Sequence, residues 1–240
     1  MRPISAIEMF NAWDRAHALS PARRALEILR AASPETPPET LAALSVGARD
    51  ARLLTVREWF FGSRIEIQVA CPQCAENIES AFQAADIRAG HEESAGSHEA
   101  VFDGCTVTFR LPDSTDLELF EKGHSEMTGN PESARRLLLS RCILAAPGAL
   151  TALAESELVA RMGELDPQAN TRLALECPAC RHRWSAVFDV GGFLWLEVHA
   201  WARRMLREIH ALAMAYGWSE REILSMSAIR RAMYLELVQS

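Results

Sequence analysis

The chain has 240 residues, 49% of them hydrophobic and 24% charged, a globular balance that excludes a disordered, collagen-like or purely coiled-coil protein. Its net charge of −7 is uneven: residues 61–180 carry −10, residues 1–60 carry +1 and residues 181–240 carry +2. Because phosphate contacts need clustered Lys and Arg, the acidic middle argues against a nucleic-acid surface there. No apolar run approaches the roughly 18 residues that span a bilayer, and the N-terminus lacks a secretion-signal pattern, so we expect a cytoplasmic protein without a membrane segment.

The N-terminal segment, residues 1–62, is predicted to be helical. Ser20 and Pro21 are typical of an N-cap followed by proline in the first helical turn. Residues 33–38 end that helix and act as a linker, because they are rich in Ser and Pro. A second helix is predicted over residues 46–61, with Gly62 ending it.

Two distant segments, residues 63–88 and 170–190, are each predicted to form a strand, a tight Cys-Pro-x-Cys turn and a second strand. The first strand of each segment alternates polar and apolar residues, which is the pattern of a half-buried strand. A shift of 106 residues overlays both cysteine pairs and three apolar positions: Ile67 on Leu173, Val69 on Leu175 and Phe82 on Phe188. The overlay predicts two similar hairpins that face each other as a split, pseudo-symmetric zinc ribbon.

Residues 89–169 are predicted to form an inserted segment. Within it we expect an exposed polar loop over residues 89–100, then a strand hairpin turning at Asp103 and Gly104. A short helix should start at Ser114 or Thr115, and longer helices are predicted over 131–146 and 152–163.

The C-terminal segment, residues 191–240, is predicted to be helical throughout. A long amphipathic helix runs from Phe193 to Tyr216 and stops at Gly217. Ser219 and Glu222 form a capping box for the next helix, and a last helix follows. The fold class is therefore α+β: mainly helical, with a small β core at the two cysteine turns.

Four of the six cysteines form the two pairs Cys71 with Cys74 and Cys177 with Cys180. In a reducing cytoplasm such spacing favours metal or redox chemistry over disulfides, and two pairs match a four-thiolate zinc site. The pairs stand 102 residues apart. Closing such a loop costs on the order of 4 kcal/mol, whereas structural zinc contributes about 10–16 kcal/mol in apparent terms. We therefore predict one structural zinc ion; iron in the same geometry and a metal-free redox dithiol remain alternatives.

Two further predictions concern the cysteine turns and the remaining thiols. Ala75 and Arg181 follow the second cysteine of each pair, where the turn needs a positive φ that usually favours glycine; a non-glycine residue there costs roughly 1–2 kcal/mol. Cys105 and Cys142 lie in apolar-patterned segments, so core packing is expected for both.

No catalytic residues are predicted, because the sequence lacks HExxH, GxSxG and phosphate-loop motifs. His182 could compete as a metal ligand, but four cysteines already complete a closed shell, which favours a structural site. A zinc-ribbon nucleic-acid-binding factor remains an alternative because of arginines on the last helices: Arg203, Arg204, Arg207, Arg230 and Arg231. Their segment carries only +2, so a solvated helix face is the better interpretation.

Several segments in a fixed order resemble one protein family. They are Arg64-Ile-Glu66 before Cys71-Pro-Gln-Cys74, Val107-Thr-Phe-Arg-Leu-Pro112 with Asp116-Leu117, Leu137-Leu-Leu-Ser-Arg-Cys142, Asp166-Pro167, Cys177-Pro-Ala-Cys180-Arg-His-Arg-Trp184, Phe193-Leu-Trp195 and His210-Ala-Leu-Ala-Met-Ala-Tyr-Gly-Trp-Ser219. Together they resemble the T-even-type baseplate hub assembly chaperone family of tailed phages and contractile injection systems, over nearly the whole chain from about residue 20.

The resemblance implies a non-enzymatic assembly factor or structural component of the baseplate hub, retained in the particle or not, that binds hub or spike subunits. It implies neither a small-molecule substrate nor a membrane or nucleic-acid partner. The Tyr216-Gly-Trp218 turn, which places aromatic rings beside a helix end, is the expected partner contact because aromatic anchors dominate interfaces.

Overall fold

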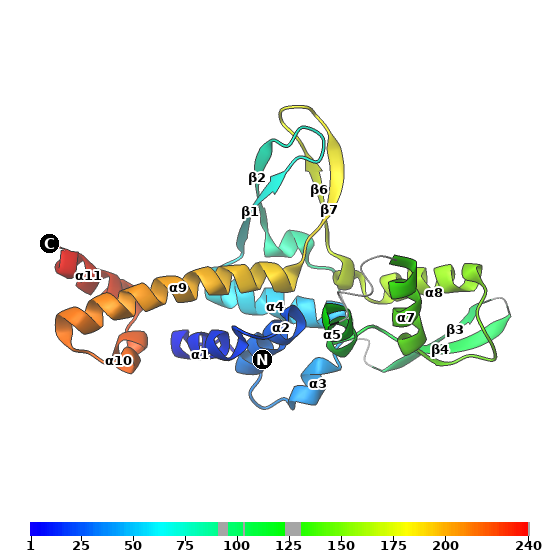
Figure 1. Cartoon of the computed structure of the whole chain (residues 1–240), viewed down its shortest axis with the longest axis horizontal. Coiled ribbons are helices and arrows are strands. Elements are labelled where there is room, and N and C mark those ends of the chain that lie inside the picture. The colour runs from blue at the N-terminus through cyan, green and yellow to red at the C-terminus, as the bar shows by residue number, and fades with distance from the viewer. Residues whose placement is uncertain (91–95, 103, 123–130, 240) are drawn as a thin grey trace.

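The computed structural model describes residues 1–90, 96–102, 104–122 and 131–239. A long helix, α9, forms a spine with the N-terminal helices packed along it, and two β hairpins stand up from it as a wing (Figure 1). The inserted segment lies near one end of α9, and the last two helices lie at the other. The architecture confirms a mainly helical α+β fold. Among the described helices, none is both long and apolar enough to cross a membrane.

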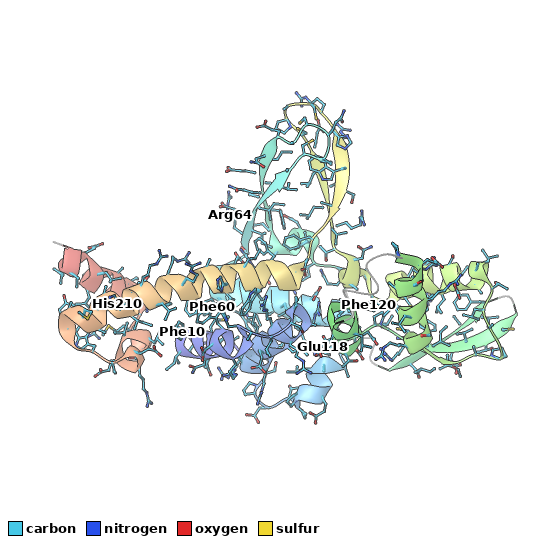
Figure 2. The ribbon with its side chains drawn as sticks, viewed as in Figure 1. Phe10, Phe60, Arg64, Glu118, Phe120 and His210 are labelled. Atoms are coloured by element: carbon cyan, nitrogen blue, oxygen red, sulfur yellow. The ribbon has the colours of Figure 1, made fainter. Side chains whose placement is uncertain are left out.

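The main hydrophobic core lies between α9 and the N-terminal helices. These elements are α1 (Ala6–Ala16), α2 (Pro21–Ala32), α3 (Pro38–Ala42), α4 (Val46–Phe61) and α9 (Val190–Tyr216). Their fully buried side chains include Met9, Leu29, Leu53, Leu194, Val198 and Leu212. Phe10 of α1 and Phe60 of α4 both pack against Trp201 of α9, with ring centroids 6.3 and 5.0 Å away, so three helices meet at one aromatic contact (Figure 2).

The helix boundaries follow local capping chemistry. The predicted helix over residues 46–61 is α4, with Gly62 at its C-terminal end. Helix α9 begins three residues before the predicted start, because the Asp189 carboxylate accepts a hydrogen bond from the Gly192 amide. Gly217 ends α9 in a left-handed conformation, with φ +67°.

The last two helices are α10 (Glu220–Ser225) and α11 (Ala228–Gln239). The predicted capping box is confirmed, since the Ser219 hydroxyl accepts from the Glu222 amide and the Glu222 carboxylate accepts from the Ser219 amide. An equivalent box that was not predicted, Ser5 with Glu8, starts α1.

The wing consists of two antiparallel hairpins with matching registers. They are β1 (Arg64–Ala70) with β2 (Asn77–Gln83), and β6 (Arg172–Glu176) with β7 (Arg183–Val187). Val69 pairs with Ile78 in the first hairpin, and Leu175 pairs with Trp184 in the second, which is the same pair shifted by 106 residues. Phe82 and Phe188 meet edge to face at the base, 5.7 Å apart. The predicted repeat is therefore a repeat in three dimensions.

A buried arginine fixes the wing to the helical body. The guanidinium of Arg57, on α4, makes two hydrogen bonds of 2.8 and 2.9 Å to the Glu197 carboxylate of α9. It also donates to the backbone carbonyls of Gly62 and Arg64 at the start of β1. One side chain thus holds two helices and the first strand at a set angle.

The inserted segment has a second, separate hydrophobic core. Its elements are β3 (Ser97–Phe102), β4 (Cys105–Arg110), α5 (Ser114–Lys122), α7 (Pro131–Cys142), β5 (Ile143–Ala145) and α8 (Ala152–Leu165), flanked by the short 3-10 helices η1 (Ala84–Ile87) and η2 (Pro167–Asn170). The strands form one sheet in the order β3-β4-β5. Phe109, Leu139, Cys142 and Leu158 are buried between this sheet and the helices.

Three predictions for the inserted segment are wrong. Residues 97–100, expected in a loop, belong to β3, whose inward positions His98 and Ala100 are too polar or small to reveal the alternation. The helix predicted over 131–146 ends at Cys142, because residues 143–145 pair with β4 instead. Cys105 is exposed at the start of β4, whereas Cys142 is buried as expected. The turn residue Asp103 and residues 91–95 lie outside the described residues.

Asp116 is the polar centre of this second core. Its buried carboxylate accepts two hydrogen bonds from Arg110, at 2.7 and 2.9 Å, and one from Arg141 at 2.7 Å. Burial raises the pKa of Asp116, but the Arg110 bonds, the Asp113 amide and Arg141 lower it more, to about 2. The ionised carboxylate therefore stabilises the folded chain.

We predict that Asp116→Asn lowers the free energy of unfolding at neutral pH. The pKa of Asp116 is lowered in the folded state, so the ionised carboxylate stabilises the fold above pH ~4. This stabilisation, about 2 kcal/mol, is lost as the pH falls from ~4 to ~2. Urea unfolding measured between pH ~4 and ~2 should show the difference in the free energy of unfolding between wild type and variant narrowing by about 2 kcal/mol. An exposed control, Glu157→Gln, should stay within about 0.5 kcal/mol of wild type at neutral pH. A gap that does not change with pH would contradict the assignment.

The inserted segment returns to the helical body through a close contact at the start of α4. The Asp166 carboxylate accepts from the Gly47 amide at 2.9 Å, a favourable place for a negative charge at a helix N-terminus. Next to it, the Gln168 side chain accepts from the Ala89 amide and donates to the Ile87 carbonyl. These bonds hold the entry and exit of the insertion together.

Gly47→Ala should therefore be destabilising. A β-carbon at Gly47 would lie 2.0 Å from the Asp166 carboxylate oxygen and 2.8 Å from the Ala169 nitrogen, so backbone must move. We expect a loss of about 1–3 kcal/mol in thermal or urea unfolding. Gly163→Ala in α8 meets nothing within 4 Å and should gain up to about 1 kcal/mol of helix propensity. Equal effects of the two substitutions would disprove the contact.

Candidate metal centre

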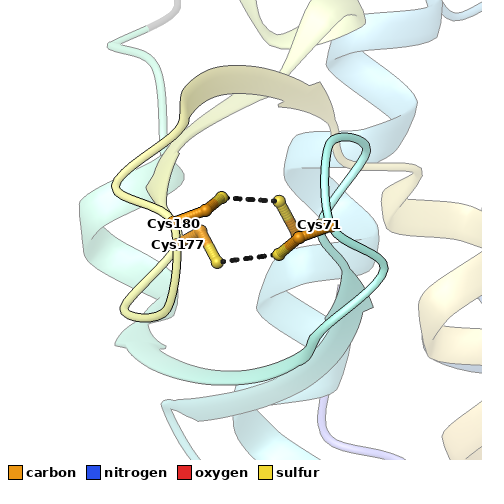
Figure 3. Close-up of side chains that lie close together, drawn as sticks. Cys71, Cys177 and Cys180 are labelled. Carbon is orange, nitrogen blue, oxygen red and sulfur yellow. Dashed lines mark hydrogen bonds between the residues drawn. The ribbon is translucent and has the colours of Figure 1, made fainter.

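The two distant cysteine pairs meet at the tip of the wing. The sulfur atoms of Cys71 and Cys180 are 3.7 Å apart, and those of Cys74 and Cys177 are 3.6 Å apart. All four sulfurs lie within 4.8 Å of one another. Figure 3 shows the two turns approaching from opposite hairpins with their sulfurs pointing inward.

These spacings suit a tetrahedral ion. Four sulfurs at about 2.3 Å from a common centre would lie about 3.8 Å from one another. The separations of 3.6 and 3.7 Å between the turns approach that value without any S–S bond. The cluster is compatible with a metal site, and among the described residues no other group of His, Cys, Asp and Glu is placed to hold an ion.

Each turn is built by the same pair of backbone hydrogen bonds. The Cys71 amide donates to the Glu76 carbonyl and the Ala75 amide donates to the Cys71 carbonyl, at 2.8 and 2.9 Å. In the second turn the Cys177 amide donates to the His182 carbonyl, and the Arg181 amide to the Cys177 carbonyl, both at 2.9 Å. This matching geometry places each pair of sulfurs on the side facing the other hairpin.

The predicted left-handed residues are confirmed. Ala75 and Arg181 both have φ of 60°, and they are the only non-glycine residues with positive φ in the described chain. Such strain, of roughly 1–2 kcal/mol at each position, persists only where the surroundings require it. Here it turns the chain back after the second cysteine, so that both thiols face one point.

The pKa values of Cys71 and Cys74 are shifted in opposite directions. Burial acts to raise the pKa of Cys71, but hydrogen bonds from the Cys74 and Gln73 amides and from neighbouring thiols lower it to about 7. At Cys74 a hydrogen bond from the Glu76 amide lowers the pKa, while its thiol neighbours and burial raise it to about 12. A bound cation would hold the thiols as thiolates, because metal ligation displaces their protons.

The surroundings of the cluster are apolar on one side and open on the other. Cys71 and Cys177 are buried against Val69, Ile78 and Trp184, whereas Cys74 is exposed and Cys180 is partly exposed. The His182 ring stacks on Trp184 at 5.8 Å and does not belong to the sulfur cluster. The cluster therefore consists of the four thiols alone.

The two aromatic residues predicted to contact a partner lie elsewhere, as do two histidines of α9. Tyr216 and Trp218 stack at 4.4 Å at the far end of α9, where Trp218 also meets Tyr234 edge to face at 4.8 Å. Tyr216 is exposed, but Trp218 is half-buried in this aromatic cluster. His199 accepts a hydrogen bond from the Trp13 indole, so it is a satisfied core histidine, and His210 is exposed.

A family model described as T4 bacteriophage base plate protein matches residues 26–145. The chain belongs to this family. The match begins in α2 and ends in β5, so it includes the first cysteine turn and stops before the second. No curated protein and no solved structure gave a match. The predicted resemblance to phage baseplate proteins is confirmed at this level.

The cluster predicts metal binding that depends on both turns. The wild-type chain should contain about one ion, and a Cys71→Ser, Cys177→Ser double variant should contain none, because a site split between two turns loses affinity from either side. Its melting temperature should fall by about 10 °C or more, since each lost kcal/mol costs roughly 2–4 °C in a chain of this size. Elemental mass spectrometry and calorimetry measure both quantities.

Cys105→Ser is the matched control, because this exposed thiol lies outside the cluster. It should keep both metal content and melting temperature. A metal-free wild type, or a double variant that retains its ion, would show that the four thiols do not share a metal.

Proposed function

We propose that this family member is a non-enzymatic assembly factor or structural component of the baseplate hub of a phage-tail-like contractile injection system. In this role it binds hub or spike subunits and carries one structural zinc ion, held by Cys71, Cys74, Cys177 and Cys180. The family match over residues 26–145 carries the proposal, because it spans half of the chain. The chain is made in the cytoplasm and acts in or on the growing particle.

The chemistry of the ligands favours zinc over iron. Four thiolates at tetrahedral spacing are the usual structural zinc shell, and such a shell leaves no position for water or substrate. Redox use of the cysteines is disfavoured, because each thiol lies beside one from the opposite turn. Redox dithiols of the CxxC type instead work as a pair within one turn, often at a helix N-terminus.

Nucleic-acid binding is the weaker alternative. Among the arginines suspected from the sequence, Arg231 is buried and paired with Glu208 at 2.6 Å. Arg230 lies over the Tyr234 ring at 5.7 Å. The remaining exposed arginines are a small group on a chain whose net charge is −7, which is too little for a phosphate-binding surface.

The C-terminal end of α9 supports a protein partner. Large apolar side chains are exposed on the last turn of α9 and on α11: Met214 at 76%, Ile229 at 77%, Met233 at 61% and Leu237 at 65%. A cluster of exposed apolar and aromatic side chains is typical of a protein-binding surface. We place the contact with a hub or spike subunit on this end, with Tyr216 and Trp218 as its aromatic anchors.

The partner contact is tested best with side chains that do little inside the chain. Because Trp218 packs in its own aromatic cluster, Trp218→Ala would mix lost binding with lost stability. A Met214→Ser, Ile229→Ser variant, which changes side chains that are 76% and 77% exposed, should instead keep its melting temperature near that of wild type and bind purified hub or spike subunits about tenfold more weakly. Calorimetric titration or a quantitative pull-down measures the change.

Leu153→Ser, on α8 in the inserted segment, is the control because this leucine is 62% exposed but lies far from α9's C-terminal end (Figure 1). It should bind like wild type. Unchanged affinity in the Met214→Ser, Ile229→Ser variant would move the contact elsewhere on the chain.

A further inference from the structure

The outward faces of the two wing hairpins carry opposite charge. From Arg64 to Gln83 the first hairpin contains one arginine and three glutamates, a net charge of −2. From Arg172 to Val187 the second contains three arginines and one glutamate, a net charge of +2 with His182 neutral. We name these surfaces the acidic face (Arg64, Glu66, Glu76 and Glu79) and the basic face (Arg172, Glu176, Arg181 and Arg183).

The charges lie on the outside of the wing because each strand alternates. In β1 the apolar Ile65, Ile67 and Val69 point toward the other hairpin, and the polar residues between them are exposed. The second hairpin follows the same pattern, with Leu173 and Leu175 inward and the charged ends exposed. The two hairpins lie opposite each other in the wing (Figures 1 and 3), so the outward acidic and basic faces lie on its two outer sides.

One equivalent position of the repeat carries opposite charge in the two hairpins, and the other charged residues of the two faces overlay neutral ones. A shift of 106 residues places Glu66 on Arg172, while the inward positions stay apolar. The same shift places Ala75 on Arg181 and Glu76 on His182. The two faces thus share one backbone shape and differ in sign, so each face of one wing complements the other face of a second wing.

The ion pairs within each face do not cancel its net charge. Arg64 pairs with Glu66 at 2.8 Å, which leaves Glu76 and Glu79 as surplus acids. Arg183 pairs with Glu176 at 2.7 Å, and Arg172 makes hydrogen bonds to Ser185. The Arg183 side chain is 80% exposed and the Glu66 side chain 70%, so these pairs contribute little inside the chain and exchange readily for pairs with another surface.

We propose that the wing is a self-association surface, on which the acidic face of one copy of this chain binds the basic face of the next. The occupant is a second copy because the complementary face is present on every chain. The contact is heterologous, so it continues from copy to copy, and it closes into a ring wherever the rotation between neighbours allows. This surface is distinct from the C-terminal end proposed for hub or spike subunits, and the inference does not depend on that function.

The test reverses each face separately and then both together. One full-length variant carries Glu66→Arg and Glu79→Arg, which makes both faces basic. A second carries Arg172→Glu and Arg183→Glu, which makes both acidic. A third carries all four substitutions, which exchanges the faces and restores the wild-type net charge of −7. Sedimentation velocity over a range of protein concentrations, at about 50 mM and about 500 mM salt, measures association.

We expect wild type to self-associate at the lower salt and to weaken at the higher salt. Each single-face variant should associate at least about tenfold more weakly, because like charges then meet. The four-substitution variant should return to within about threefold of wild type, and an equimolar mixture of the two single-face variants should associate again.

The control reverses the same amount of charge away from the wing. Glu157→Arg with Glu164→Arg, on exposed positions of α8, should leave association unchanged to within about threefold. Metal content and circular dichroism confirm that each variant keeps its fold. A wild type that stays monomeric at every concentration overturns the proposal and assigns the faces to other partners, as does a four-substitution variant that stays as weak as the single-face variants.

Discussion

The meeting of two cysteine turns separated by 102 residues is the constraint on which the rest of this structure depends. Whatever lies between the turns must leave the first hairpin and return to the second at nearly the same place. The entropic cost of such a closure is about 4 kcal/mol. Contacts at the base of the wing offset part of this cost before any ion binds: Phe82 packs on Phe188, and Arg57 ties β1 to α4 and α9. A metal at the tip would act on a frame that is already closed.

The insertion satisfies this constraint by having its own core and a polar attachment. Its apolar side chains pack around Phe109 and Leu158 and do not merge with the core along α9. Its connection to the helical body includes directed bonds, chiefly Asp166 with Gly47 and Arg23 of α2 with Glu118 of α5. Hydrogen bonds specify position more strictly than apolar contacts do, because they fail beyond about 3.5 Å. The insertion can thus vary in its interior while its two ends stay in register with the wing.

Much of this arrangement could be predicted from the sequence, and the reasons differ by element. The cysteine spacing and the 106-residue repeat predicted the wing, because metal-binding turns and half-buried strands impose strict residue types at strict intervals. Helix α4 and the capping box at Ser219 were predictable for the same reason, since their signals are local. Strand β5 was not, because residues 137–145 contain no Gly or Pro that would end a helix, and only pairing with β4 ends the helix at Cys142.

The long-range polar contacts could not be predicted from any local sequence pattern. Asp166 and Arg57 have no local sequence signal that predicts their burial, although both are buried and decide how segments meet. Cys105 was expected in the core because its segment has an apolar pattern. It is instead the first residue of β4, next to the hairpin turn, and it is exposed. Burial of a polar residue, or exposure of an apolar-looking one, is a property of the assembled fold.

The repeat in the wing separates positions that the fold requires from positions that it leaves free. Sulfur placement, the left-handed residues Ala75 and Arg181, and the inward apolar positions are alike in both hairpins, since packing and ligand geometry restrict them. The outward positions face only solvent within one chain, so folding sets neither their identity nor their sign. Two faces of the same shape and opposite charge therefore call for a cause outside the single chain. Complementarity between copies supplies such a cause, because it acts on the sign of the charge and leaves the interior of the wing unchanged.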